Sequence, residues 1–485
     1  MTTTSNSTNA ASTHLAEGAL GFPEALATAV GLIIASSVLL TATQGFGVGG
    51  WVFALAIVVA YILMMCQSAS FAEAAGILPT SGAVYDYVAA GMGRFWAITG
   101  TLAAYMLVHI FAGTAEVSAV GLFAQVNFDF LANLPAESTW IIGTVLVGIF
   151  MVVNLLGINV YGRVEVVMTA VMWLTLTLFG LLGVLKATQS GISGYFGESM
   201  VGVDVTAVLV MTGLAMFLFV GVEYVTPLAP ELKNPHQNIP RAMYLGVTLV
   251  AVAMFVYGAG IARQVQNVEL EPGVMLFDTP LPIPAFGEAI MGGFGKLWLG
   301  IAALLAGTAT INTLIAGIPR ILYGMAKDGT LPSSFAYLHP RYKTPWIGIF
   351  FVAIIPIIGS IWIRGDIGSI IAFILAAVCA WIFGYILVNI SVVVLRMKRP
   401  DLKRPYKTPL YPLPQIVATV GMLITIWYIT PPFLTPDQIY LPFLVMLLVC
   451  AGFALIWTYG VQQINPWVRI EPETLIAEEG LTVDD

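Results

Sequence analysis

The sequence predicts an all-α fold: a polytopic membrane protein with twelve transmembrane helices. Hydrophobic residues make up 59% of the 485 residues and charged residues only 9%, whereas soluble domains carry roughly 25% charged residues. A helix needs ~20 apolar residues to cross a bilayer core. Runs of that length recur along almost the whole chain, and the mean hydropathy is +0.91. Hydropathy therefore argues strongly against a soluble enzyme.

Each predicted span is an apolar run bounded by polar residues, glycine or proline. The twelve runs lie near residues 24–45, 50–75, 95–124, 139–158, 163–186, 204–229, 241–263, 295–323, 345–363, 367–396, 413–431 and 438–461.

The positive charges predict the orientation, because cytoplasmic loops collect Lys and Arg. With both termini inside, four of the 19 basic residues fall outside, namely Lys186, Arg263, Lys296 and Arg364, and the remaining fifteen fall inside. The opposite orientation would reverse this bias. We therefore expect a multi-pass protein of the cell (inner) membrane with cytoplasmic N- and C-termini.

Several kinds of chemistry lack their sequence signals. Cys66, Cys379 and Cys450 each lie in a predicted span, no CxxC is present and the four histidines are scattered. A metal site or a disulfide framework is therefore not expected. No GxxxxGK[ST] phosphate loop occurs, which argues against transport driven by ATP. We expect no cofactor and no nucleic-acid partner.

The sixth span, VTAVLVMTGLAMFLFVGVEYVTPLAPE, is unsuited to a continuous helix. Gly221 lowers helix propensity, and Pro227 lacks an N–H and clashes with the preceding turn. A break near 219–223 would free backbone amides and carbonyls for a ligand, which membranes tolerate only beside protein or a water-filled cavity. A proline-kinked helix packed around the glycine is the alternative.

The first span, GFPEALATAVGLIIASSVLLTATQG, has a similar interruption. Gly31 and the run Ala35-Ser36-Ser37 divide it near its middle. Interrupted helices at corresponding positions of two halves indicate a transporter's midplane site. The N-terminus of a half-helix attracts an anionic group, and freed carbonyls suit an ammonium ion or another cation.

Four stretches resemble the amino acid–polyamine–organocation (APC) superfamily. GVEYVTPLAPELKNPHQNIPRAM is similar to its sixth helix and following loop, and RILYGMAKDGTLPSSFAYLHPRYKTPW to the segment after its eighth helix. FAEAAGILPTSGAVYDYVAAGMG is similar to the stretch after its second helix, and LRMKRPDLKRPYKTPLYPLPQIV to its tenth-to-eleventh loop. The four matches occur in the expected order and span most of the chain.

The resemblance implies a LeuT-type fold, which has a 5+5 inverted repeat with broken helices 1 and 6 plus two additional helices. Substrate would lie between spans 1, 3, 6, 8 and 10. The implied organisation is a disordered tail (1–20), the two repeats (21–200 and 201–400), the last two helices (401–465) and an acidic tail (466–485). The resemblance also implies secondary transport of amino acids or related amines, by proton coupling or exchange.

The sequence departs from the family at two positions. The first-helix break of amino acid carriers usually has Gly-Ser-Gly, and Ala35-Ser36-Ser37 aligns with it here. Because glycines let backbone amides approach closely, this change counts against a standard carboxylate clamp. Met172 aligns with a fifth-helix lysine that stands in for sodium in several relatives.

Ionisable groups at membrane depth need a reason, because they are costly. His109 and Glu116 are seven residues apart and would share a helical face. Glu116 is either a residue of the extracellular vestibule or a site for a substrate amine or a coupling proton. His109 is either a packing residue or a titratable binding group. Glu223 is predicted to act in proton coupling or gating.

The predicted substrate site combines both breaks with side chains from the third, eighth and tenth spans. Phe219 is expected to close over substrate, with core packing as the alternative. Thr310 would complete a sodium site or bond its own i−4 carbonyl. The predicted substrate-binding residues are Ala35, Ser36, Ser37, Val38, Tyr105, His109, Phe219, Val220, Gly221, Thr310 and Trp381, with Glu223 and Glu116 for coupling or gating.

The leading hypothesis is a proton-coupled amino acid importer that works by alternating access. Its substrate's carboxylate would meet the amides near Ser36 to Val38, and its ammonium the carbonyls near Phe219 to Gly221. The alternative is an amine or polyamine carrier or exchanger, which the altered first break favours. A channel, a nutrient sensor and a membrane enzyme rank lower. Expected partners are the small solute, a proton ahead of sodium, and the lipid bilayer, with the chain a monomer or homodimer.

Overall fold

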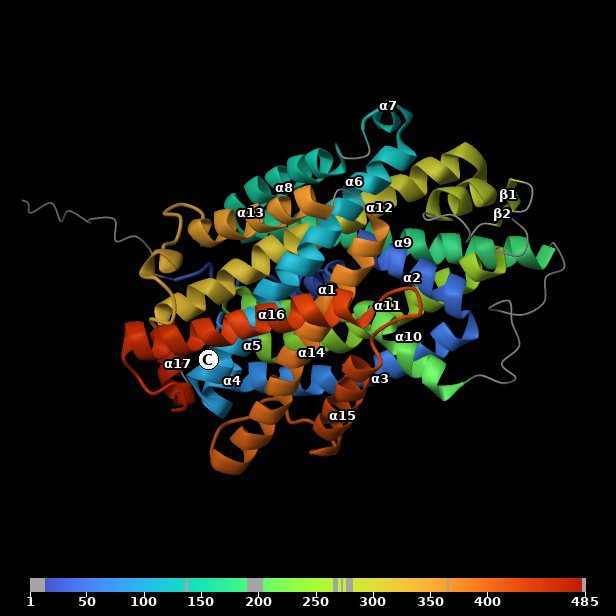
Figure 1. Cartoon of the computed structure of the whole chain (residues 1–485). Coiled ribbons are helices and arrows are strands. Elements are labelled where there is room, and N and C mark those ends of the chain that lie inside the picture. Colours follow the sequence, from blue (N-terminus) through green and yellow to red (C-terminus); the bar gives the residue numbers. More distant parts are fainter. Residues whose placement is uncertain are drawn as a thin grey trace, which may run out of the picture.

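The structure is a bundle of long helices, and the computed structural model describes residues 14–135, 138–189, 204–264, 269–271, 274–275, 282–363 and 366–481. Most long helices run roughly along one direction of the bundle (Figure 1). The short strands β1 and β2 lie near one end of it, and the last helix lies at the opposite end (Figure 1).

The first part of the chain forms two helical segments in place of the first predicted span, then four further spans. The elements are α1 (Phe22–Gly31), α2 (Ser36–Gly49), α3 (Trp51–Ile77), α4 (Val84–Met92), α5 (Arg94–Thr101), the π-helices η1 (Leu102–Leu107) and η2 (His109–Gly113), α6 (Thr114–Asn127), α7 (Asp129–Ala132), α8 (Thr139–Leu155) and α9 (Ile158–Gln189).

The remaining chain repeats the pattern of a broken span followed by continuous ones. Its elements are α10 (Val205–Phe217), the 3-10 helix η4 (Val222–Glu231), α11 (Pro235–Gln264), the antiparallel pair β1 (Glu269–Glu271) and β2 (Val274–Met275), α12 (Pro282–Lys327), the 3-10 helix η6 (Ser333–Ala336), α13 (Trp346–Ile363), α14 (Ile367–Lys398), α15 (Leu413–Trp427), α16 (Pro436–Leu455), the π-helix η7 (Ile456–Gln462) and α17 (Pro472–Glu478).

The helical, membrane-spanning class predicted from hydropathy is confirmed. Among the described residues, nine helices are long and apolar enough to cross a membrane, or ten with the bent pair α1–α2 counted as one. The helices α8 and α15 match the fourth and eleventh predicted spans but are shorter, at 17 and 15 residues. The total of twelve therefore stays a prediction.

The outer surface of α8 indicates that this short helix also faces lipid. Ile141, Val145, Ile149 and Val152 are exposed, and their spacing of three or four residues places them on one face. An apolar stripe of this kind is unusual on a soluble surface. It suits the hydrocarbon side of a bundle.

The first predicted break is present, within the stretch from Gly31 to Ser37 that was expected to interrupt the span. The helices α1 and α2 meet at an angle of 52°, separated by Leu32–Ala35. Ala35 is extended, with φ −99° and ψ 162°. The backbone amides of Ser36 and Ser37 therefore start a new helix and have no intrahelical carbonyl to donate to.

The second predicted break is also present, between α10 and η4. Gly221 adopts φ +105°, a conformation that glycine enters without steric cost. The chain then continues as a 3-10 helix that contains Pro227 and Pro230, since proline cannot support the α-helical hydrogen-bond ladder. A side chain at Gly221 would collide with that of Leu32. The two breaks therefore lie against each other, and the alternative of a continuous kinked helix does not apply.

Buried ion pairs join helices at the end of the bundle where the last helix lies. Arg320 binds Glu231 at 2.9 Å, with both side chains almost fully buried. Arg94 binds Asp328 at 2.6 Å.

Much of the acidic C-terminal tail is ordered against the bundle. Helix α17 leads to Glu479, whose carboxylate accepts hydrogen bonds from the Ser81 amide at 2.9 Å and from the Ser81 hydroxyl at 2.6 Å. The carbonyl of Glu479 lies 3.0 Å from Nδ1 of His14. Both described ends of the chain thus meet beside the turn that precedes α4.

Candidate functional site

The site is organised around a carboxylate at the start of α2. Glu116 extends from α6 to the first break, where its Oε1 accepts the Ser36 amide at 2.7 Å and its Oε2 the Ser37 amide at 3.1 Å. The Ser37 hydroxyl donates to Oε2 as well. Glu116 is fully buried. A helix N-terminus favours an anion through its free amides and its dipole, so Glu116 fills an anion site of its own chain.

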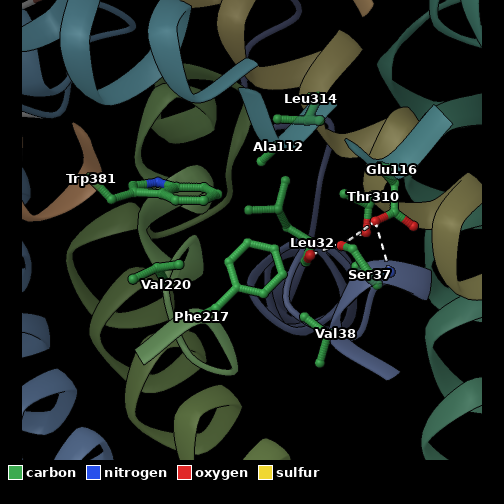
Figure 2. A pocket seen from close by; sticks show the side chains of 11 residues that line it. Leu32, Ser37, Val38, Ala112, Glu116, Phe217, Val220, Thr310, Leu314 and Trp381 are labelled. Carbon is green, nitrogen blue, oxygen red and sulfur yellow. Dashed lines mark hydrogen bonds between the residues drawn. The ribbon is translucent and has the colours of Figure 1, made fainter. Parts of the chain in front are cut away.

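A small, almost closed cavity lies beside this carboxylate. It leaves about 10 Å³ open to the centre of a water molecule, which is room for roughly one water. Figure 2 shows Phe217 and Trp381 on one side of it and Glu116 with Ser37 on the other. The lining residues are Leu32, Ala35, Ser37, Val38, Ala112, Glu116, Phe217, Val220, Thr310, Leu314 and Trp381.

Glu223 does not line the cavity, but it hydrogen-bonds a residue that does. Its carboxylate accepts from the Tyr385 hydroxyl at 2.5 Å, from Nε1 of Trp381 at 3.1 Å and from the Gly221 amide at 3.2 Å. Since Trp381 lines the cavity and also bonds Glu223, the indole connects the two. Glu223 thereby ties η4 to α14 across the second break.

Thr310 of α12 fixes the end of the first half-helix. Its hydroxyl lies 3.1 Å from the carbonyl of Leu32, 3.3 Å from that of Ala306 and 3.4 Å from that of Gly31. Both predicted uses of this hydroxyl, the first-span carbonyls and its own i−4 carbonyl, are thus within hydrogen-bond reach. A hydroxyl donates one hydrogen at a time.

A third buried carboxylate was missed by the sequence analysis. Glu165 of α9 is fully buried and accepts from Nδ2 of Asn312 at 2.6 Å and from the Thr313 hydroxyl at 3.0 Å. It packs against the end of α1, because a Cβ at Gly31 would collide with its carboxylate. The signal was available: Glu165 is the one acidic residue in the fifth predicted span, GRVEVVMTAVM.

Six acidic side chains buried in the described part of the bundle form two groups, apart from Asp86 and Glu479 near the C-terminal tail. Glu231, Glu73 and Asp328 pair with arginines. Glu116, Glu165 and Glu223 have neutral hydrogen-bond donors and, among the described residues, no basic side chain in ion-pair contact. Ionisable residues that lack such a partner inside a membrane are the stronger functional candidates.

The structure gathers seven of the predicted site residues around the cavity: Ala35, Ser37, Val38, Glu116, Val220, Thr310 and Trp381. Ser36 and Gly221 contribute backbone amides beside it, to Glu116 and to Glu223 respectively. The apolar lining residues Leu32, Ala112, Phe217 and Leu314 were not predicted, because nothing in an apolar span separates a lining side chain from a packing one.

Three predicted residues lie elsewhere. His109 bonds the carbonyl of Val352 at 2.7 Å, so its ring points to α13. Phe219 packs near Tyr61, with ring centroids 6.3 Å apart, and Phe217 occupies the cavity wall instead. His109 and Glu116 bond to different helices, α13 and α2, and the π-helix η2, which has a wider turn than an α-helix, begins at His109.

The hydroxyl of Tyr105 also stays apart from the cavity lining. Its ring packs on Tyr224 at 4.9 Å between centroids, and its oxygen has no hydrogen-bond partner among the described residues.

The sequence is similar to characterised transporters. The family model for amino acid permease matches residues 20–456. The branched-chain amino acid permease BcaP of Bacillus subtilis (strain 168) is 26% identical over 79% of this chain and 82% of its own. The serine/threonine exchanger SteT of the same organism is 25% identical over 83% of this chain and 89% of its own.

The fold is similar to that of a solved transporter. Mhp1, a nucleobase-cation-symport-1 family transporter solved in a closed conformation with bromovinylhydantoin bound, aligns over 98% of this chain and 99% of its own with a TM-score of 0.53. The identity of 16% makes this a likeness of fold alone. The arrangement is of the LeuT type, with its first and sixth spans broken. The family match covers most of the chain, and the protein belongs to the amino acid permease family.

Proposed function

We propose that this protein is a secondary active transporter that carries an amino acid or a related amine across the cell membrane by alternating access. One observation carries the proposal: the two broken helices meet at a small cavity that is almost closed in this conformation. Backbone groups without an intrahelical partner at the breaks, with a cavity between them, are what a midplane solute site requires.

The position of the cavity in the bundle supports the same proposal. Its walls come from the first broken span, η2 with α6, the second broken span, α12 and α14. These correspond to the first, third, sixth, eighth and tenth predicted spans. The names of the relatives BcaP and SteT, a branched-chain amino acid permease and a serine/threonine exchanger, favour small amine-bearing solutes.

Coupling to protons is the proposed driving force, with Glu223 as the residue that takes up the proton. Among the described residues Glu223 has neutral donors rather than a basic partner, and one of these donors, Trp381, also lines the cavity. A change in the charge of Glu223 would alter its hydrogen bonds to the Gly221 amide and to the indole of Trp381. Sodium is the less favoured ion. Thr310 could supply one oxygen near the carbonyl of Leu32, but that hydroxyl is already engaged.

Import into the cytoplasm is the proposed direction. It is the direction in which an inward proton gradient would drive a proton-coupled carrier. The bias of Lys and Arg toward one set of loops favours a cytoplasmic location for both termini, in the cell (inner) membrane. Residues 21–200 and 201–400 are proposed as the two inverted repeats, with a monomer or homodimer as the working unit.

Counterflow in proteoliposomes tests the proposal. Vesicles are loaded with an unlabelled solute and diluted into the same solute with a radiolabel, using a panel of amino acids and of their decarboxylated amines. We expect uptake of label above that of protein-free vesicles for at least one solute. If no solute in the panel is exchanged, the protein is a sensor or a channel rather than a carrier.

A further inference from the structure

Two of the backbone donors at the start of α2 are already engaged by the chain itself. The amides of Ser36 and Ser37 each carry one hydrogen, and both donate to Glu116. The Ser37 hydroxyl also donates to Glu116, and the Ser36 hydroxyl donates to the carbonyl of Ala303. A carboxylate of a solute would need these same donors. To bind there it would have to displace Glu116 and leave it buried beside a second negative charge.

Helix α12 leaves space for the carboxylate of Glu116 because it has a glycine, Gly307, beside it. A Cβ at Gly307 of α12 would lie 2.6 Å from Oε1 of Glu116 and 2.5 Å from the Ser36 hydroxyl. Only a glycine leaves room for the carboxylate and the start of α2 together. The contact between Glu116 and the first break is therefore built by three helices, α2, α6 and α12.

The lining beside Glu116 suits a cation with an apolar body, once the cavity opens to admit one. Glu116 is the one charged side chain among the residues that line it. The rings of Phe217 and Trp381 form the opposite side (Figure 2), and aromatic faces attract ammonium groups. Glu223 does not line the cavity and would not meet a second ammonium there, so a monoamine fits better than a diamine.

We propose that Glu116 takes the place of a solute carboxylate and makes the protein selective for small primary amines that have no carboxylate. The ammonium lies near Glu116, and the alkyl or aryl group lies against the apolar wall. A zwitterionic amino acid is disfavoured, because its carboxylate finds the amides of Ser36 and Ser37 already occupied by Glu116. This inference rests on the proposed transport function and names its substrate class.

Matched solute pairs test the inference on the purified full-length chain. Binding is measured by calorimetry for leucine, leucinamide and 3-methylbutylamine, and for phenylalanine and phenethylamine, with putrescine as the diamine. We expect at least one of the two amines to bind at least tenfold more tightly than its parent amino acid. Leucinamide keeps the size of leucine but loses the negative charge, so we expect it, like the amines, to bind more tightly than leucine. Equal or tighter binding of the amino acids overturns the inference.

Variants of Glu116 supply the second test. Glu116→Ala frees the amides of Ser36 and Ser37, so amine affinity should fall at least tenfold while the ratio of amino acid to amine binding rises. Glu116→Gln removes the charge but keeps the amides occupied, so amine affinity should fall without any gain for amino acids. Ser118→Ala is the control on the same helix, because the Ser118 hydroxyl has no hydrogen-bond partner among the described residues.

The outcomes separate this inference from the proposed function. Counterflow of leucine without counterflow of either amine leaves the carrier function standing and overturns the amine selectivity. Absence of binding and counterflow for every solute overturns both. If the Glu116 variants do not fold, the wild-type solute pairs still decide the question.

Discussion

The carboxylate of Glu116 and the amide of Ser37 lie 3.1 Å apart and join the third span to the first break. The two residues are 79 positions apart in the chain. Their contact satisfies donors that α2 would otherwise leave unpaired. It also places a carboxylate at the wall of the cavity, where we propose that it selects among solutes.

Replacing Glu223 with glutamine should remove the pH dependence of transport. The glutamine keeps the size of the side chain but cannot take up and release a proton, so uptake driven by an inward proton gradient should fall about tenfold. The measurement is initial uptake in proteoliposomes with and without the gradient. Tyr385→Phe is the control: it removes the hydroxyl that bonds Glu223 but keeps the carboxylate, so acid stimulation should persist. Unchanged stimulation in Glu223→Gln would remove this residue from coupling.

Adding a methyl group at Gly31 should destabilise the protein. A Cβ there would lie 2.6 Å from the Thr169 hydroxyl and would collide with Glu165, and overpacking of this kind costs about 1–3 kcal/mol. We expect Gly31→Ala to lower the midpoint of thermal unfolding in detergent. The double variant with Glu165→Ala, compared with Glu165→Ala alone, should show a much smaller loss. Equal losses in both backgrounds would mean that Glu165 does not pack against the end of α1.

The buried pair between Arg320 and Glu231 should be sensitive to the loss of one partner. Removing one member leaves an uncompensated charge, which typically costs about 3–5 kcal/mol. Arg320→Met and Glu231→Gln should each reduce thermal stability strongly, and the double variant should be more stable than Arg320→Met. Additive losses in the double variant would show that the two side chains are not coupled.

The C-terminal attachment should be tighter in acid. Burial, with the neighbouring charge of Glu479, raises the pKa of Asp86 well above its usual value, and burial raises the pKa of Glu479. A raised folded-state pKa means that stability present below the ordinary carboxyl pKa is lost as pH rises through the raised values. Hydrogen exchange of residues 472–481, corrected for intrinsic rates, should therefore show more protection at pH 5.5 than at pH 8. In Glu479→Gln this pH dependence should weaken, and stronger protection at pH 8 in the wild type would contradict the account.

The sequence predicted the spans and both breaks because their causes are local. A long apolar run favours a membrane-spanning helix. A glycine followed by a proline, as at Gly221 and Pro227, disrupts the helical hydrogen-bond ladder at that point. The positions of side chains around the cavity were harder to predict. Helix α10 ends at Phe217, so the irregular turn that follows directs Phe219 away from the wall that Phe217 forms. In the third span the π-helices have wider turns than an α-helix, and His109 and Glu116 bond to different helices.

The role of Glu116 could not be predicted in the form that the structure gives it. Its sequence neighbours suggest only an acidic residue in an apolar helix, and its partners at Ser36 and Ser37 come from a different span. The altered first break, Ala35-Ser36-Ser37, was the visible part of the same feature. The sequence showed the altered first break and the buried acidic residue separately, but it did not show that the two are in contact.

Cysteine accessibility at Val220 tests most directly whether the cavity between the breaks is the transport site. Val220 lines the cavity, and a Val220→Cys variant in a background without Cys66, Cys379 and Cys450 gives a single thiol there. If access alternates, a membrane-impermeant thiol reagent labels this cysteine slowly from either side of sealed vesicles, and a transported solute slows the labelling further. Labelling that no transported solute affects, in a variant that still transports, would show that the solute passes elsewhere.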